Sequence, residues 1–230
     1  MREIVLDTET TGLDSGKGDR LVEIGAVEMV NQIPTGKTFH VLLNPERDVP
    51  EEAYRIHGHS TESLKYSPVF AEIASELIAF IGDDRLVIHN AEFDMKFINA
   101  ELLRAGRELI PLERVTDTLA LARRKHPGAP NNLDALCDRY RINSSARTKH
   151  GALLDARMLV DVYAELTGGR QKSLTLSVEP TGNRPAARLA AALRKRIIQE
   201  RARLSKAESV VHLDHVATLG ETAIWLRYAG

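Results

Sequence analysis

The sequence predicts a mixed α/β domain, a sheet with helices packed on it, followed by a linker and a tail. Three short β-rich apolar runs open the chain, at 3–6, 21–30 and 38–43, and a fourth follows at 85–89. Apolar residues at helical spacing follow the third run and again the fourth. Strands followed by helices in this way are typical of a layered α/β or α+β architecture.

Turns and caps give the expected elements in order. Polar turns at 31–32 and 34–36 separate the second and third runs, so the first three strands are expected to form an antiparallel meander. Pro50 and the two acids after it begin a short helix that runs toward Gly58. Further helices are expected from Ser67–Pro68, over 91–105, 119–125 and 133–140 and up to Leu166, with a last strand at 115–117.

Composition excludes several classes of protein. The chain has 230 residues, of which 43% are hydrophobic, as in a globular protein with a full core. Its one cysteine, Cys137, excludes an intramolecular disulfide framework and is expected in the core. No apolar run reaches the length of a membrane span or of a secretory signal. These features favour a cytoplasmic protein with no membrane partner.

Charge divides the chain into an acidic body and a basic tail. Residues 169–230 carry eleven Lys and Arg and five Asp and Glu. Of the totals of 31 Lys and Arg and 32 Asp and Glu, this leaves 20 basic and 27 acidic residues in 1–168. We therefore expect a domain at 1–168, a linker rich in Gly, Ser, Thr and Pro at 169–185, and a C-terminal segment at 186–230. This segment holds an amphipathic, basic helix at 186–206 and the only Trp, within 222–228.

Asp7 and Glu9 follow the first apolar run, directly before a turn signal at Thr11 and Gly12. We expect them where a buried strand ends, on one face, since successive strand residues alternate between faces. Two like charges there repel each other and are costly to desolvate, and a divalent cation between them reverses that balance. The pair predicts half of a metal site; the alternative is a solvated strand end with two unrelated acids.

Two more acids lie on the apolar faces of expected helices. Asp94 shares a face with Phe97, Ile98 and Leu102, and Asp155 shares one with Leu159, Val162 and Leu166. An unpaired buried carboxylate is costly, so each needs a partner. The partner is either a metal ion or an arginine, such as Arg123 or Arg157.

Together these acids form a constellation drawn from three separated segments. It comprises Asp7, Glu9, Asp94 and Asp155, with His150 five residues before the last. Carboxylate ligands suit hard ions such as Mg²⁺ or Mn²⁺, whereas Zn²⁺ would call for more His and Cys.

The same three segments resemble a known family. Residues 7–12, 89–94 and 150–155 resemble the three motifs of the DEDD exonucleases, in the histidine-containing (DEDDh) branch. Residues 23–27, 56–58, 115–119 and 132–137 also resemble the epsilon proofreading subunits of bacterial DNA polymerase III. The likeness is strong over residues 1–168 and weak in the tail. It implies an RNase H-like mixed sheet flanked by helices.

The resemblance implies a chemistry for the constellation. Asp7, Glu9, Asp94 and Asp155 would hold two divalent ions, Mg²⁺ or Mn²⁺, and His150 would take the proton from the attacking water. The reaction would be 3′→5′ proofreading of a single-stranded or frayed 3′ end of DNA, with release of nucleoside 5′-monophosphates. The alternatives are a stand-alone exonuclease acting on RNA or DNA ends, and a mainly structural scaffold between polymerase and clamp.

Weaker candidates surround this set. Thr10, Thr11 and Gly12 are expected near the terminal nucleotide, and His57 and Asn90 are candidates for phosphate contacts, although Asn90 is equally placed to cap its helix. Phe93 is expected in the core rather than as a base-stacking ring. His59 stands where the family has an aliphatic residue, and the sequence assigns it no role.

The linker and the tail suggest protein partners. Gln171, Leu174 and Leu176 resemble a peptide that binds the sliding clamp, and an extended segment with apolar anchors suits a preformed groove. An incidental linker is the alternative. The segment 186–230 is expected to dock the catalytic (alpha) subunit of the polymerase, while the basic charge of its helix also permits direct contact with DNA.

Overall fold

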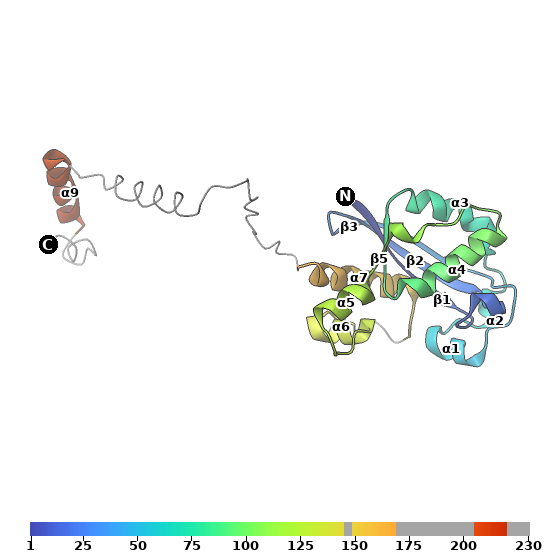
Figure 1. The fold of residues 1–230 in the computed structure, drawn as a ribbon. Coiled ribbons are helices and arrows are strands. Elements are labelled where there is room, and N and C mark those ends of the chain that lie inside the picture. Colours follow the sequence, from blue (N-terminus) through green and yellow to red (C-terminus); the bar gives the residue numbers. More distant parts are fainter. Residues whose placement is uncertain (145–148, 169–204, 220–230) are drawn as a thin grey trace, which may run out of the picture. The chain divides into compact units, whose positions relative to one another are not determined.

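The computed structural model describes residues 1–144, 149–168 and 205–219 of the chain (Figure 1). The chain divides into two compact units, Met1–Leu174 and Thr175–Gly230. This division falls within the expected linker. Within the described residues, no helix is both long and apolar enough to cross a membrane.

The first unit is built on a five-stranded sheet of order β3-β2-β1-β4-β5. β1, β2 and β3 form the expected antiparallel meander, whereas β4 and β5 run parallel to β1. The turn between β2 and β3 needs only two residues, Asn31 and Gln32, both with positive φ (53° and 66°). β3 therefore starts earlier than expected. The strands are β1 (Arg2–Thr10), β2 (Leu21–Val30), β3 (Ile33–Leu42), β4 (Arg85–Ile88) and β5 (Val115–Asp117).

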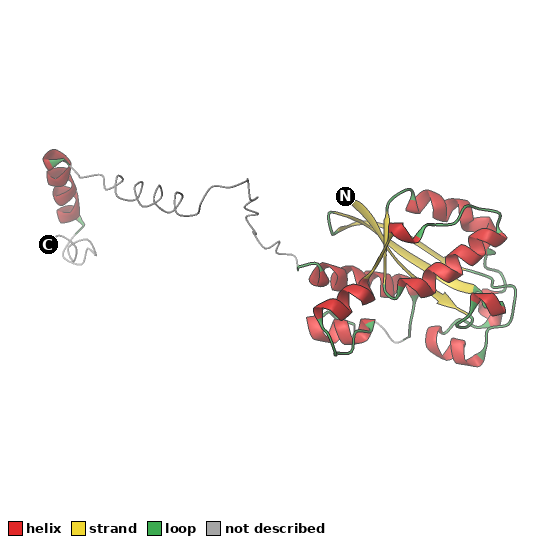
Figure 2. Cartoon of the chain, viewed as in Figure 1, coloured by secondary structure: helices red, strands yellow, loops and turns green. Residues whose placement is uncertain are grey.

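Helices flank this sheet (Figure 2), and all those expected in residues 1–168 are present with small shifts at their ends. α2 was not expected, although Ser60 and Ser63 form a reciprocal capping box at its start. The helices are α1 (Glu51–His57), α2 (Thr61–Leu64), α3 (Phe70–Ile81), α4 (Ala91–Arg104), α5 (Thr118–Lys125), α6 (Leu133–Tyr140) and α7 (Ala152–Leu166), with 3₁₀ turns η1 (Ser15–Lys17) and η2 (Leu112–Arg114).

β1 is buried on both faces, which explains why it reads as one continuous apolar run. Ile4 and Leu6 belong to a core cluster formed with α3 and α4. Val5, between them, belongs to a second cluster formed with α6 and α7, which includes the buried Cys137. The end of β1 thus lies between two helical layers, and α4 and α7 can each bring a side chain to it.

α7 lies directly against β2 at Gly25. A Cβ atom built on Gly25 would lie 2.1 Å from the backbone nitrogen of Leu153 and 2.3 Å from the carbonyl carbon of Ala152. Only glycine allows so close an approach of two backbones. The first turn of α7 is therefore held close to the sheet.

The second unit contributes one described helix, α9 (Lys206–Thr218). The sequence prediction missed it. Ser205 and Glu208 form a reciprocal capping box at its start, a pattern that can be recognised in the sequence. The expected helix at 186–206 lies outside the described residues except for its last two positions, and the segments 171–176 and 222–228 lie wholly outside them.

Candidate active site

Asp7 and Glu9 line one pocket of about 180 Å³, as two residues on the same face of a strand should. They lie at the end of this strand, as expected. β1 continues to Thr10, and its pairing with β2 shifts register between Glu9 and Thr10. The two carboxylates therefore belong to the last regularly paired residues of the strand.

Asp94 enters the same pocket from the first turn of α4 and is only 3% exposed. Its Oδ1 accepts a hydrogen bond of 2.6 Å from the hydroxyl of Thr8, rather than from an arginine. Burial raises the pKa of Asp94 to about 7, and the hydrogen bond from Thr8 only partly opposes this. A bound cation would remove the cost of ionising this carboxyl group.

α7 supplies the fourth acid, Asp155, which is 3% exposed. His150, just before this helix, places its Nδ1 3.3 Å from Oδ2 of Asp155. The backbone N–H of His150 donates to the carbonyl oxygen of Ile56 at 3.1 Å, and the Lys149 ammonium lies 4.6 Å from the ring centre of Tyr54. α1 thus anchors the segment that carries His150.

The pocket gathers the whole predicted constellation. Ligand atoms of Glu9, His150 and Asp155 lie within 4.8 Å of one another, a spacing that could hold a metal ion. Asp7 from β1 and Asp94 from α4 complete an oxygen-rich donor set that fits a hard divalent cation. The lining residues are Asp7, Thr8, Glu9, His89, Asn90, Phe93, Asp94, Leu133, His150 and Asp155.

Other expected substrate contacts do not line this pocket. Thr10 donates to the carbonyl oxygen of Gly12 at 2.6 Å, and the hydroxyl of Thr11 accepts from the backbone N–H of Arg20 at 3.0 Å. His57 is buried and stacks on the ring of His59, with 5.3 Å between ring centres. Burial lowers the pKa of His57 to about 4, so its ring is neutral near pH 7.

Asn90 lines the pocket. The sequence suggested that its side chain could cap α4, but the structure shows no such cap. It adopts the left-handed conformation (φ 65°), and its side chain makes no capping hydrogen bond. Asp117 fixes this strained junction, because its Oδ1 accepts the N–H groups of Asn90 (3.0 Å) and Leu119 (2.9 Å). The end of β5 therefore ties the starts of α4 and α5 together.

Glu23 explains the histidine at position 59. It is 4% exposed, pairs with Glu9 across β1 and β2, and accepts hydrogen bonds from His59 (3.0 Å) and His40 (2.8 Å). Burial raises its pKa, but the bonds from His59, His40 and the N–H of Ala152 outweigh this and leave it lowered. Glu23 thereby holds the first residue of α7 beside the strand that carries Glu9.

Thr8, Glu23 and Asp117 have roles at the site that the sequence did not predict. Glu23 and Asp117 lie in segments that resemble the family, but only the fold shows what they bind. Phe93 was expected in the core, and this is half right. Its ring packs on Phe97 with 5.0 Å between centres, and it also lines the pocket.

Sequence comparisons identify what this chain is similar to. The family model described as exonuclease matches residues 4–163. A DNA polymerase III subunit epsilon from Rickettsia felis is 55% identical over 179 residues, covering 76% of this chain and 78% of the relative. One from Salmonella typhimurium is 43% identical over 239 residues and covers 97% of both chains.

Among solved structures, exonuclease X in complex with 5′ overhanging duplex DNA is similar in fold. Its TM-score is 0.58 at 24% sequence identity, over 72% of this chain and 90% of that one. The likeness establishes the RNase H-like mixed sheet flanked by helices that the sequence resemblance implied.

Proposed function

The chain belongs to the exonuclease family and, within it, to the epsilon subunits of bacterial DNA polymerase III, and on that premise we propose that its four acids hold two divalent metal ions. Its activity is 3′→5′ exonucleolytic proofreading of DNA. The observation that supports the metal site is the convergence of Asp7, Glu9, Asp94 and Asp155 from three segments in one pocket.

The ions would be Mg²⁺ or Mn²⁺, because four carboxylates offer oxygen ligands and no cysteine is among the described residues that line the pocket. Asp7 would be shared between the two ions. When bound, they would lower the pKa of the attacking water and neutralise charge that develops on the leaving oxygen. The raised pKa of Asp94 supports this assignment, since a buried acid without a cation resists ionisation.

His150 would act as the general base. Asp155 faces its Nδ1, so Nε2 is the nitrogen that would accept the proton of the attacking water. The water oxygen bonds to the phosphorus, the bond from phosphorus to the 3′ oxygen breaks, and that oxygen takes a proton from solvent. The products are a nucleoside 5′-monophosphate and a strand shorter by one nucleotide with a new 3′ hydroxyl.

The substrate would be a single-stranded or frayed 3′ end of DNA. Mispairing lowers the cost of separating the terminal nucleotide, so the site needs little base specificity. Thr10, Thr11, Gly12, His57 and Asn90 are proposed to lie near that nucleotide. The hydroxyl groups of Thr10 and Thr11 form hydrogen bonds within the turn that follows β1. The contacts proposed for Thr10 to Gly12 are therefore through the backbone.

The rest of the chain would recruit partners. We propose that residues 1–168 form the catalytic domain, that Gln171, Leu174 and Leu176 in the linker 169–185 bind the sliding clamp, and that 186–230 docks the alpha subunit. Val210, Val211 and Leu213 on α9 are each more than half exposed, which suits a helix that packs on another protein. A pull-down with the full chain and with a version ending at Leu166 tests this division.

A rate assay on single-stranded DNA in Mg²⁺ tests the catalytic assignment. Asp7→Asn and Asp94→Asn are expected to abolish hydrolysis, and His150→Ala to lower it by about 10²- to 10⁴-fold, as removal of a general base does. Glu92→Gln, an exposed acid that pairs with Lys96 on the same helix as Asp94, is the matched control and should keep full activity.

Near-normal hydrolysis by a folded Asp7→Asn or Asp94→Asn variant would refute the metal assignment. Rates on matched DNA and RNA strands distinguish the replicative function from a stand-alone exonuclease on RNA, because a preference for RNA would require contacts to the 2′ hydroxyl. A chain that binds the polymerase but hydrolyses neither strand would instead be a scaffold.

A further inference from the structure

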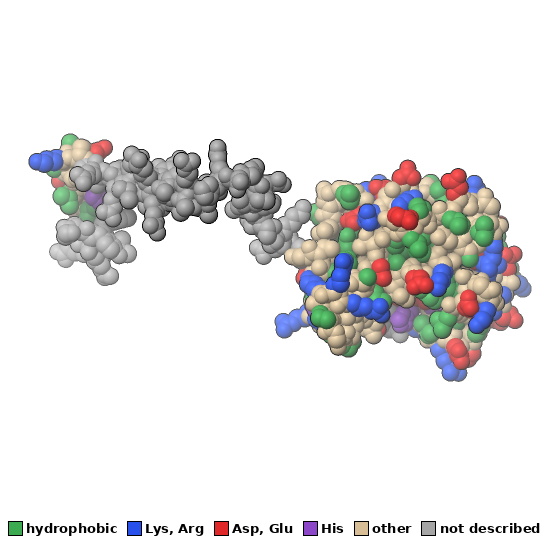
Figure 3. All heavy atoms as spheres, viewed as in Figure 1, with side chains coloured by type: hydrophobic (Ala, Val, Ile, Leu, Met, Phe, Trp, Pro, Cys, Tyr) green, Lys and Arg blue, Asp and Glu red, His purple; other side chains and the backbone are tan. Residues whose placement is uncertain are grey.

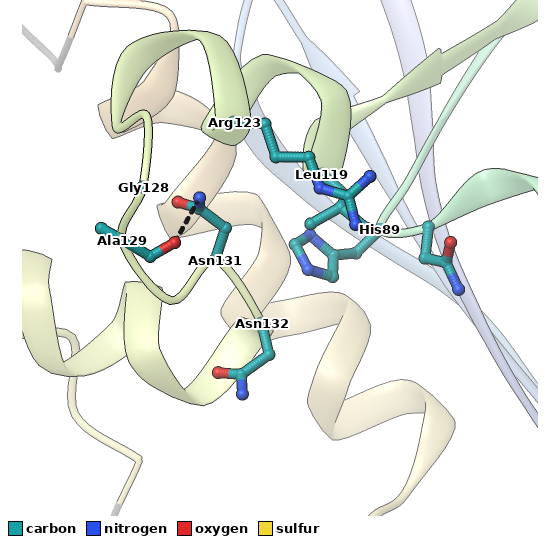
Figure 4. A pocket seen from close by; sticks show the side chains of 8 residues that line it. His89, Leu119, Arg123, Gly128, Ala129, Asn131 and Asn132 are labelled. Atoms are coloured by element: carbon teal, nitrogen blue, oxygen red, sulfur yellow. Dashed lines mark hydrogen bonds between the residues drawn. The ribbon is translucent and has the colours of Figure 1, made fainter.

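A second, larger cavity opens beside the metal pocket. Its volume is about 730 Å³, and it shares His89 and Asn90 with the lining of the metal pocket (Figure 4). α5 contributes Leu119 and Arg123, and the segment between α5 and α6 closes the opposite side. The remaining lining residues are Gly128, Ala129, Asn131 and Asn132.

Arg123 gives this cavity a positive charge. Its side chain extends from α5 toward His89 (Figure 4). Burial lowers the pKa of His89, and the positive charge of Arg123 also lowers it. No carboxylate in the described part of the chain pairs with Arg123. By contrast, Lys125 on the same helix is bound to the carbonyl oxygens of Glu165 and Leu166. Figure 3 shows Lys and Arg side chains gathered over α5.

The wall opposite α5 is held in place by its own hydrogen bonds. The Asn131 amide donates to the carbonyl oxygens of His126 (3.2 Å) and Ala129 (2.8 Å). Asn132 caps α6 by accepting the N–H of Ala135 at 2.8 Å. A wall fixed in this way gives a preformed cavity, so a ligand pays little to order it.

The reaction itself requires such a neighbouring site. Hydrolysis cuts between the last two nucleotides, and the leaving 3′ oxygen belongs to the second one. The metal pocket, of about 180 Å³, has room for little beyond the reacting phosphate. The strand behind that phosphate must therefore lie in space that opens directly off the pocket.

We propose that the larger cavity binds the next phosphodiester upstream of the scissile one, with Arg123 as its anion contact. This inference rests on the proposed function and adds a substrate-positioning residue to it. A guanidinium group suits phosphate oxygens. No Phe, Tyr or Trp is among the described residues that line the cavity, which favours a phosphate contact over base stacking as its role. Contact to phosphate carries no sequence preference, as proofreading of any end demands.

The test compares Arg123→Ala with Arg124→Ala, the adjacent exposed arginine on the same helix, which does not line the cavity. Steady-state rates are measured on a short single-stranded oligonucleotide and on the p-nitrophenyl ester of thymidine 5′-monophosphate, which has no upstream phosphate. Arg123→Ala should raise KM for the oligonucleotide by about 5- to 30-fold, with a smaller change in kcat. Its loss in kcat/KM on the ester should be much smaller.

Salt supplies a second readout. Losing one phosphate contact should reduce the slope of log affinity against log salt by about 0.7 for a single strand. An unchanged KM and salt slope in Arg123→Ala, equal losses in both arginine variants, or equal losses on oligonucleotide and ester would each overturn the inference. If the unaltered chain hydrolyses no DNA, the proposed function itself fails, which is a different result.

Discussion

Gly25→Ala is the substitution whose effect follows most directly from the geometry. The added Cβ would lie 2.1 Å from the backbone nitrogen of Leu153, whereas carbon and nitrogen atoms normally stay at least about 3.4 Å apart. The first turn of α7 would therefore have to retreat by about 1.3 Å. Backbone atoms form this contact, so no side-chain rotation relieves it.

The retreat should cost both stability and rate. Overpacking of this kind typically costs about 1–3 kcal/mol, which for a domain of this size lowers Tm by roughly 2–12 °C. α7 carries Asp155, and the segment before it carries His150. A displacement of about 1 Å in a catalytic group can cost on the order of 10²-fold in rate. We therefore expect kcat on single-stranded DNA to fall by about that factor.

The assay combines thermal unfolding with steady-state hydrolysis in Mg²⁺. Gly16→Ala is the matched control, because its Cβ would meet only the flexible Asp14 side chain, at 3.1 Å. That variant should keep the parental Tm and kcat. Wild-type Tm and kcat in Gly25→Ala would show that α7 is not pressed on β2 and would refute the reasoning.

Three further predictions follow from the buried charges. The pKa of Asp94 is about 7 in the folded metal-free protein and normally near 3.8, so stability of that form should fall as pH rises from about 4 to 7. Mg²⁺ competes with this proton, so added Mg²⁺ should raise Tm more at pH 8 than at pH 6, and equal increases would contradict the assignment. The His57 ring should titrate near pH 4 when followed by NMR. Because burial favours its neutral form, the stability that this histidine contributes is lost as pH falls from about 6.5 toward 4. A titration midpoint above about pH 6 would be inconsistent with its burial. Glu23→Gln should cost about 1.5–3 kcal/mol in unfolding free energy and lower kcat more than it raises KM, whereas Glu92→Gln should do neither.

The sequence was sufficient for the features that depend on local periodicity. The apolar run of β1 and the helical spacing around Asp94 and Asp155 predicted which side chains point inward, and all four acids of the constellation are buried or half-buried in one pocket. The resemblance of three motifs to DEDDh exonucleases added what spacing could not, namely that these segments meet.

Features that depend on register or on backbone conformation could not be predicted. Glu23 acquires its role because it pairs with Glu9 across two strands and because His59 and His40 reach it from other elements. Asn90 is a residue type that both caps helices and adopts the left-handed conformation, and only the fold decides between these uses.

α9 was missed for a different reason. Its apolar residues, among them Val210, Val211 and Leu213, spread over a wide arc of the helix instead of a narrow stripe, so periodicity gives little signal. The capping box of Ser205 and Glu208 was available in the sequence and marks the start of the helix.

The central claim is that Asp7, Glu9, Asp94 and Asp155 hold two divalent ions where the 3′ end of DNA is cut. The most direct measurement is the anomalous difference density of crystals soaked with Mn²⁺. The account predicts two peaks within coordinating distance of these carboxylates, with Asp7 between them. Density that is absent from this pocket, or that lies elsewhere in the chain, would contradict it.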